Sequence, residues 1–213
     1  MSRRWLILVC MSVPASSVGQ VEPPRQGPGA VLAALEDRLL AADGIRFEFE
    51  VTAEGAIEAD LRGMLEASAG EVRLTAAGSF AGQAVDLTLL ADGDRLELGN
   101  GPELDRIPTP AYLNEALVIG LTRMGILHNL ARLTGGTAPD HAGGGIRDWV
   151  TVGAVTADAD TIAFDLTVAG EPAGSAALQI DSGGRPVLRR QTVEFSTGQM
   201  RVVERYSAFT IDE

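Results

Sequence analysis

The sequence predicts an α+β protein built on one antiparallel sheet of about ten strands, with helices on a single face. Apolar and polar residues alternate with a period of two from residue 45 to 100, and again from residue 146 to 211. Glycine and aspartate turn residues separate the alternating runs, and helical patterns stand before the first run and between the two. A sheet of this size tends to curl, so we expect a strongly curved sheet.

The first residues predict a signal peptide over residues 1–19. Arg3 and Arg4 form a basic start, residues 5–13 are apolar except for Ser12, and small residues offer cleavage after Ser17 or Gly19. The apolar run is shorter than the roughly 20 residues of a membrane span, so we expect no transmembrane segment after cleavage. The alternative is a disordered apolar N-terminus of a cytosolic protein.

A linker rich in proline and glycine follows over residues 20–29. The only cysteine, Cys10, lies inside the expected signal peptide. The mature chain would therefore lack cysteine, which excludes disulfides and thiol chemistry.

Residues 30–42 predict an amphipathic helix that packs on the apolar face of the sheet. One face carries Val31, Leu35 and Leu39, and the opposite face carries Glu36, Asp37 and Arg38. Asp43 and Gly44 end this helix, with the glycine suited to a left-handed stop.

Residues 45–98 predict four to five strands. Over residues 57–67 the content of leucine, methionine, alanine and glutamate would also suit a helix, but strict alternation favours a strand. The expected turns are Gly55, Gly70, Gly82 and the pair Asp92 and Gly93.

Residues 111–133 predict a helical segment that is apolar almost all round. This segment forms an insert in the domain, at about residues 110–134, that is expected to act as the lid. Such a helix is usually buried on two sides. Gly120 and Gly125 suggest a bend or two shorter helices, and Glu115, Arg123 and His128 argue against a membrane span.

The second alternating run predicts five further strands, over residues 146–155, 161–168, 175–180, 187–196 and 200–211. The whole of residues 30–213 is expected to form a single domain, since 213 residues suffice for one substantial core.

Charge narrows the classes of partner. The chain carries a net charge of −12, and all 17 of its basic residues are arginine. An acidic surface argues against nucleic acid and against anionic membrane as partners.

No catalytic constellation is visible, so the sequence predicts a protein that is not an enzyme. The two histidines, His128 and His141, exclude a histidine-rich metal site, and no cofactor or metal is expected. The glycines after His141 resemble an oxyanion-hole loop, but no G-x-S-x-G elbow accompanies them. The absence of lysine excludes a P-loop and a Schiff base. Asp158 and Asp160 flank a turn and are interpreted as solvated carboxylates.

The order of elements resembles the LolA-like superfamily of periplasmic proteins, which includes the lipoprotein carrier LolA. The resemblance covers residues 30–212 and rests on AVLAALEDRLLAADGIRFEFEV, LADGDRLEL and the closing RRQTVEFSTGQMRVVERYSAFTI. It implies a half-barrel whose concave face is covered by a helical lid, enclosing an apolar cavity that holds acyl chains in the carriers. No functional residue is transferred, since none matches by motif.

A ligand cavity is accordingly expected beneath the inserted helices. Its apolar wall would comprise Phe47, Phe49, Ala59, Leu61, Gly63, Leu65, Leu74, Gly78, Leu87, Leu89, Phe164 and Leu166. The lid would contribute Leu117, Leu121, Met124 and Leu127. Small residues at positions 59, 63 and 78 mark where the wall is thin, and the pattern leaves open whether helices or a ligand fill that volume.

The sequence thus predicts a periplasmic binding protein, exported by its signal, that shields a lipid or an acylated molecule such as a lipoprotein. Burial of each CH₂ is worth ~0.8 kcal/mol, so an acyl chain needs no polar signature. The alternative is an envelope protein-interaction or sensor module with a filled core and an envelope protein partner. A third hypothesis is an enzyme-like domain whose site is assembled from distant residues.

Overall fold

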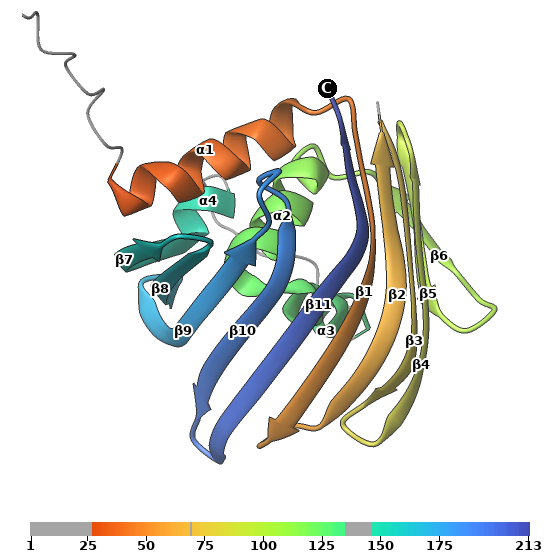
Figure 1. Cartoon of the computed structure of the whole chain (residues 1–213). Helices are drawn as coiled ribbons and strands as arrows, with labels where there is room; N and C mark the ends of the chain where they lie inside the picture. Colours follow the sequence, from red (N-terminus) through yellow and green to blue (C-terminus); the bar gives the residue numbers. More distant parts are fainter. Residues whose placement is uncertain (1–26, 69, 135–145) are drawn as a thin grey trace, which may run out of the picture.

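One curved antiparallel sheet organises the molecule, as the sequence predicted. The computed structural model describes residues 27–68, 70–134 and 146–213. The expected signal peptide, most of the linker and His141 lie outside these residues. Eleven strands lie in the order β6-β5-β4-β3-β2-β1-β11-β10-β9-β8-β7 within the described residues, with helices behind the sheet and across one end (Figure 1). This arrangement confirms the α+β half-barrel with a helical lid.

The first half of the sheet is a meander that closely follows the predicted strands. Its strands are β1 (Gly44–Gly55), β2 (Ala59–Ser68), β3 (Glu71–Phe80), β4 (Gln83–Asp92), β5 (Arg95–Asn100) and β6 (Asp105–Pro108). The alternation over residues 57–67 does form a strand, β2, because its alternate side chains are buried. Strand β6 was missed, because its four residues are all exposed and carry no apolar alternation.

The second half is also a meander, with two corrections to the predicted strand starts. Its strands are β7 (Val150–Asp158), β8 (Thr161–Val168), β9 (Glu171–Ile180), β10 (Pro186–Phe195) and β11 (Gly198–Asp212). The predicted strand over residues 146–155 begins late, because Ile146–Trp149 forms the short helix α4. Strand β9 also begins earlier than predicted, at Glu171.

Strands β1 and β11 join the two halves at the centre of the sheet. They pair from Gly44 with Asp212 at one end to Gly55 with Met200 at the other. A bulge in this ladder turns both Tyr206 and Phe209 to the buried side. The Phe47 ring stacks on Phe209 at 4.9 Å between centroids and meets Tyr206 edge-on at 5.5 Å.

The helices cover the inner face and one end of the sheet. Helix α1 (Pro28–Ala41) begins two residues inside the expected linker and contacts α2 and β7 (Figure 1). Its end is not a left-handed stop at Gly44, because Ala42 takes an extended conformation and Gly44 already belongs to β1. Gly44 instead allows close packing, since an added Cβ would lie 3.1 Å from Asp212 Oδ2.

The apolar insert is divided at its glycines, as predicted, but into three short pieces rather than two. These are α2 (Leu113–Ile119), the π-helical turn η1 (Gly120–Met124) and α3 (Ile126–Thr134). Gly125 separates the last two with a φ of 87°, which favours glycine. No helix in the described residues is long and apolar enough to cross a membrane.

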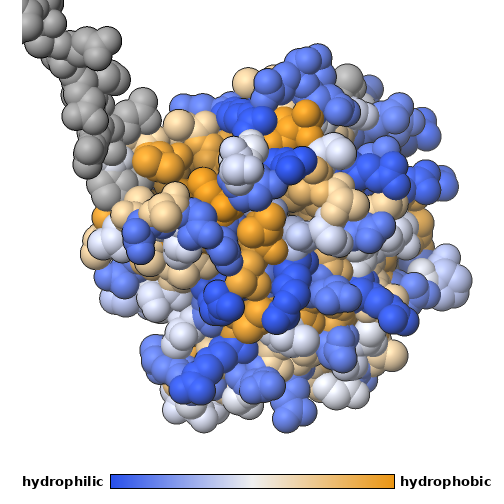
Figure 2. Space-filling view, in the orientation of Figure 1, coloured by the Kyte–Doolittle hydropathy of each residue, from blue (hydrophilic) through white to orange (hydrophobic). Residues whose placement is uncertain are grey.

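The outer face of the sheet is turned toward the viewer in Figure 1, and Figure 2 shows it to be mostly hydrophilic with a narrow hydrophobic band. Along β1 every second side chain is buried, from Ile45 to Ala53, and the residues between them are exposed. The sheet is therefore apolar inside and polar outside, which places the core between the concave face and the helices.

We expect Phe209→Ala to lower the free energy of unfolding by about 3–5 kcal/mol, because it removes the ring stacked on Phe47 and leaves a cavity. Phe195→Ala is the matched control: its side chain is 40% exposed, and we expect a loss below about 1 kcal/mol. Urea denaturation of both variants measures the difference, and equal losses would contradict this description of the core.

Candidate functional site

An apolar cavity of about 330 Å³ lies beneath the lid, at the end of the sheet away from α1. Met124, Leu127 and His128 line it from the lid side. The sheet contributes Leu166, Val168, Val193, Phe195, Met200 and Val202. Phe80, at the end of β3, and Ile57, in the turn between β1 and β2, complete the wall opposite. The volume lies at the lower end of the range of small-molecule sites, about 300–1,000 Å³.

Two polar side chains line this cavity among the described residues, Gln191 and His128, and the other eleven lining residues are apolar. Gln191 pairs across the sheet with Val202 on β11 and with Ala176 on β9, both of which are buried. Residues paired across a sheet share a face, so Gln191 points to the concave side. The cavity is thus suited to a chain of carbon atoms, with one amide at its wall.

The predicted wall residues lie mostly in the packed core rather than at this cavity. Ten of the twelve are buried, all except Gly63 and Gly78, and Leu166 is the only one of the twelve that lines the cavity. The four predicted lid residues are also buried, and two of them, Met124 and Leu127, line it. The predicted wall is therefore part of the buried core, and the open volume lies nearer the strand ends.

The two wall glycines do not open onto free space. An added Cβ at Gly63 would overlap the backbone carbonyl oxygen of Thr75 and lie 2.5 Å from Cζ of Phe49, so the neighbouring strands fill this position. An added Cβ at Gly78 would overlap the backbone carbonyl of Asp60, and its φ is 143°. The interpretation of these glycines as thin places in the wall was wrong. Atoms of neighbouring strands, including the Phe49 ring, occupy the space at Gly63, and two strands approach closely at Gly78.

Most of the residues that line the cavity were not among the predicted wall and lid residues. Val193 and Phe195 alternate with Thr192 and Glu194 at the end of β10, and Met200 begins the buried set of β11. This alternation is visible in the sequence, but the residues at its end lie next to turns. A large apolar residue beside a turn is easily assigned to the core. Partial exposure of Phe195, at 40%, is visible only in the structure.

A buried ion pair attaches η1 to α1. Arg123 Nε and Nη2 each donate to the Glu36 carboxylate at 2.7 Å, and Thr122 Oγ1 donates to it at 3.1 Å. Arg123 Nη1 also donates to the carbonyl oxygens of Arg147 and Val150, at 3.1 and 2.5 Å. The expectation that Glu36 lies on the polar face of its helix was wrong: its side chain is buried, because Arg123 neutralises it.

A second buried carboxylate fixes the start of α3 on the sheet. Glu204 of β11 accepts hydrogen bonds from the backbone N–H groups of Ile126 and Leu127, both at 2.9 Å, and from the Tyr206 hydroxyl at 2.5 Å. These N–H groups have no partner within the helix, and a negative charge also suits the positive end of the helix dipole. Gly125 is required beside them, since an added Cβ would lie 2.5 Å from Glu204 Oε1.

Arg189 of β10 is fully buried next to this carboxylate. Its Nη2 donates to the carbonyl oxygen of Arg123, and its Nη1 donates to Gln191 Oε1 at 2.8 Å. Burial lowers the pKa of the guanidinium, while the charge of Glu204 acts in the opposite direction. Burial also raises the pKa of the Tyr206 hydroxyl well above its usual value of 10.0, and the nearby Glu204 charge raises it further.

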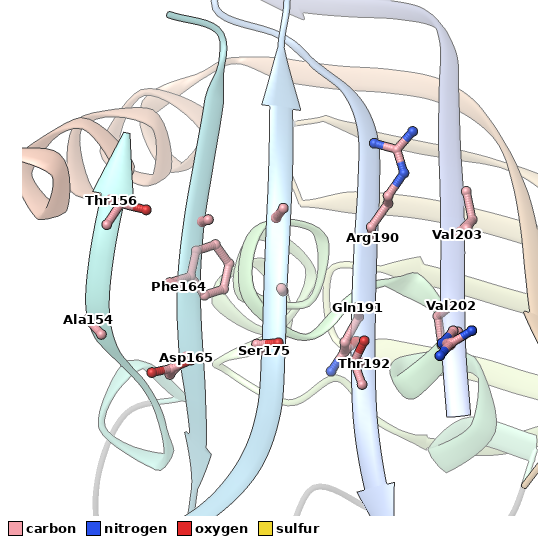
Figure 3. A pocket seen from close by; sticks show the side chains of 14 residues that line it. Ala154, Thr156, Phe164, Asp165, Ser175, Arg190, Gln191, Thr192, Val202 and Val203 are labelled. Atoms are coloured by element: carbon pink, nitrogen blue, oxygen red, sulfur yellow. The ribbon is translucent and has the colours of Figure 1, made fainter. Parts of the chain in front are cut away.

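A larger hollow, of about 520 Å³, lies across β7 to β11, and among the described residues seven polar and seven apolar side chains line it (Figure 3). Asp165, Ser175 and Arg190 border it and are exposed, whereas their strand neighbours Phe164 and Ala176 are buried. Alternation therefore places this hollow on the outer face of the sheet. This hollow is an open outer surface bordered by the charged side chains of Asp165, Arg190 and Arg201, whereas the cavity beneath the lid is lined almost wholly by apolar residues. The cavity beneath the lid is therefore the better candidate site for an apolar ligand.

Asp160, one of the residues weighed for catalysis, has a carboxylate held by two hydrogen bonds. Gln179 and Thr161 donate hydrogen bonds to the Asp160 carboxylate, at 2.8 and 3.0 Å, and lower its pKa. A carboxylate of lowered pKa is a poor general acid. Within the described ranges, no group of three or more His, Cys, Asp or Glu side chains could hold a metal ion.

Comparison with known proteins finds similarity in solved structures only. No protein-family model matches the chain, and no curated protein matches it. A LolA superfamily protein from Nitrosomonas europaea has a TM-score of 0.39 at 10% identity, with 88% of this chain and 94% of that chain covered.

Two further solved structures are similar at the same level. LprF from Mycobacterium bovis has a TM-score of 0.35 at 10% identity, with 87% and 96% covered. A putative outer membrane lipoprotein-sorting protein domain from Vibrio parahaemolyticus has a TM-score of 0.33 at 9% identity, with 87% and 92% covered. The superfamily that the sequence resembles is thus present among these structures. All three TM-scores lie below 0.5, so the function proposed below rests on the cavity and not on these likenesses.

We expect Arg123→Met to lower the free energy of unfolding by about 3–5 kcal/mol, because it leaves the buried Glu36 carboxylate without its counter-charge. The control is Arg106→Met: Arg106 pairs with Glu97 at 2.7 Å, but its side chain is 73% exposed. An exposed pair contributes about 0–1 kcal/mol. Chemical denaturation would contradict the assignment if the two variants lost equal stability.

Tyr206 should ionise only when the protein unfolds. Its pKa is raised in the folded state, so above pH ~10 the folded chain keeps a proton that the unfolded chain loses. Stability therefore falls with rising pH in that range, by up to about 1.4 kcal/mol per pH unit from this group. In a Tyr112→Phe background, phenolate absorbance should rise together with the loss of circular dichroism. Phenolate formation in the native fold would contradict the buried hydroxyl.

Proposed function

We propose that this protein binds one apolar chain, such as the acyl chain of a lipid or of an acylated protein, in the cavity beneath its helical lid. The observation that carries the proposal is the cavity itself, which has about 330 Å³ of volume and a lining of eleven apolar and two polar residues. A fully packed core has few voids larger than a water molecule. A volume of this size, on the inner side of a lid held by two buried carboxylates, is suited to a ligand.

The chemistry of the lining supports an acyl chain over a polar ligand. Val193, Met200 and Leu127 offer no hydrogen bonds, so affinity would come from removing CH₂ groups from water, at ~0.8 kcal/mol each. Methionine side chains, here Met124 and Met200, adapt to an irregular chain. In this proposal the protein is a carrier or sensor of the bacterial envelope rather than an enzyme, and it acts in the periplasm after its signal is removed.

A second candidate is an envelope protein-interaction module without a ligand. It is favoured by the tight packing of the predicted wall, where Phe49 fills the position beside Gly63. In that case the cavity would be a packing defect, and function would lie on the outer surface. Native mass spectrometry of protein purified from its own envelope separates the two, because a carrier should retain lipid and an interaction module should give the bare mass.

Adjacent residues on opposite faces of β10 offer a matched test of the cavity. We expect Val193→Glu to weaken uptake of a fluorescent fatty acid by tenfold or more, because it places a charge in an apolar cavity. Thr192→Glu introduces the same charge on the outer face, and we expect its affinity to stay within about twofold of the parent. Fluorescence titration measures both. Equal affinities, with both variants folded by circular dichroism, would remove the cavity as the binding site.

A further inference from the structure

Gln191 is the one polar side chain that the sheet contributes to the cavity, and its amide is held in a single orientation. Arg189 Nη1 lies 2.8 Å from Gln191 Oε1. A guanidinium can only donate hydrogen bonds, so the amide atom that faces it must be the oxygen. The amide nitrogen is therefore the group that remains for a ligand.

No residue in the described part of the chain accepts a hydrogen bond from Gln191 Nε2. Val202 beside it and Val193 two residues along β10 are apolar and line the same cavity. The wall thus presents a hydrogen-bond donor, with no acceptor from the sheet next to it. Desolvating a donor without giving it a partner costs free energy, so a ligand that provides an acceptor binds more tightly than one that does not.

The groups behind Gln191 strengthen this donor. Arg189 is positively charged and fully buried, and its hydrogen bond to the amide oxygen polarises the amide. The carbonyl oxygen of Arg123 and the charge of Glu204 hold Arg189 in place. Arg189 Nε makes no hydrogen bond within the described residues. The positive charge of Arg189, on one side of the amide, therefore favours an electron-rich ligand atom at the amide nitrogen.

We propose that the ligand is an acyl compound whose carbonyl oxygen, from a carboxylate or an ester, accepts a hydrogen bond from Gln191 Nε2 while its alkyl chain fills the cavity. This inference rests on the proposed function, because it specifies the head group of the same ligand. An alkyl amine would place its own donors against the amide donor and a simple alkane would leave the amide unpaired. Both should bind more weakly than the acid or the ester.

The test uses the mature chain with four probes of equal chain length: decanoic acid, methyl decanoate, decylamine and decane. Each competes against a bound fluorescent fatty acid. We expect the acid or the ester to bind on the order of tenfold more tightly than the amine and the alkane, as one hydrogen bond of this kind predicts. A preference for the acid alone identifies a free carboxylate as the head group, and equal binding of acid and ester identifies the neutral carbonyl.

Two variants of Gln191 make the test specific. Gln191→Leu should remove the preference for acyl probes while alkane binding persists. Gln191→Glu keeps an oxygen for Arg189 but replaces the amide N–H donor with a second oxygen, which is an acceptor. The order of affinities should therefore invert, so that decylamine binds more tightly than decanoic acid. A merely structural role of Gln191 would not produce this inversion.

The outcomes separate the two proposals. If the parent protein takes up none of the four probes, the proposed function fails and this inference fails with it. If decane or decylamine binds as tightly as the acyl probes, the cavity is a binding site but the role of Gln191 is overturned. The same conclusion follows if Gln191→Leu and Gln191→Glu retain the parent's order of affinities while remaining folded by circular dichroism.

Discussion

The position of the lid depends on a carboxylate buried in the middle of the sheet. Glu204 lies on β11, the strand that pairs with β1 to join the two halves, and it accepts the first free N–H groups of α3. A buried charge is tolerable only when it is hydrogen-bonded and compensated. That requirement explains the nearby residues: Tyr206 donates to it, Arg189 supplies the opposite charge, and Gly125 lets the helix approach. The same cluster orients Gln191 at the cavity wall.

The concave face has two regions that are packed differently. Toward α1, side chains from the sheet and the helices interdigitate, with Phe47 against Phe209 and the ring of Phe49 in the space beside Gly63. Toward the other end, Met124 and Leu127 of the lid line a cavity together with Phe80, Phe195 and Met200 of the strand ends. The cavity lies in this second region. Curvature is the physical reason, because strands that diverge from the lid leave volume that short loops cannot fill.

Much of the architecture could be predicted from alternation alone. The burial pattern of β1 follows the predicted period of two, and the glycines at 120 and 125 did divide the inserted helix. The site was harder to predict. Leu166, Met124 and Leu127 were expected and do line the cavity, but Val193, Phe195 and Met200 were not expected. Periodicity assigns a residue to a face of the sheet, and it does not say how far along the strand the helices reach.

The sequence by itself determined the class of fold, the inward face of several strands, β1 to β4 and β8 among them, and the acidic net charge, because these follow from local periodicity and composition. Only the tertiary structure decided which buried charges meet. Glu36 and Arg123 stand 87 residues apart, and Glu204 and Ile126 stand 78 apart. Such pairs carry no local signal, since a helix face or strand face has the same pattern whether its one charged residue points to water or to a distant partner. The cavity and its single oriented amide depend on those pairs.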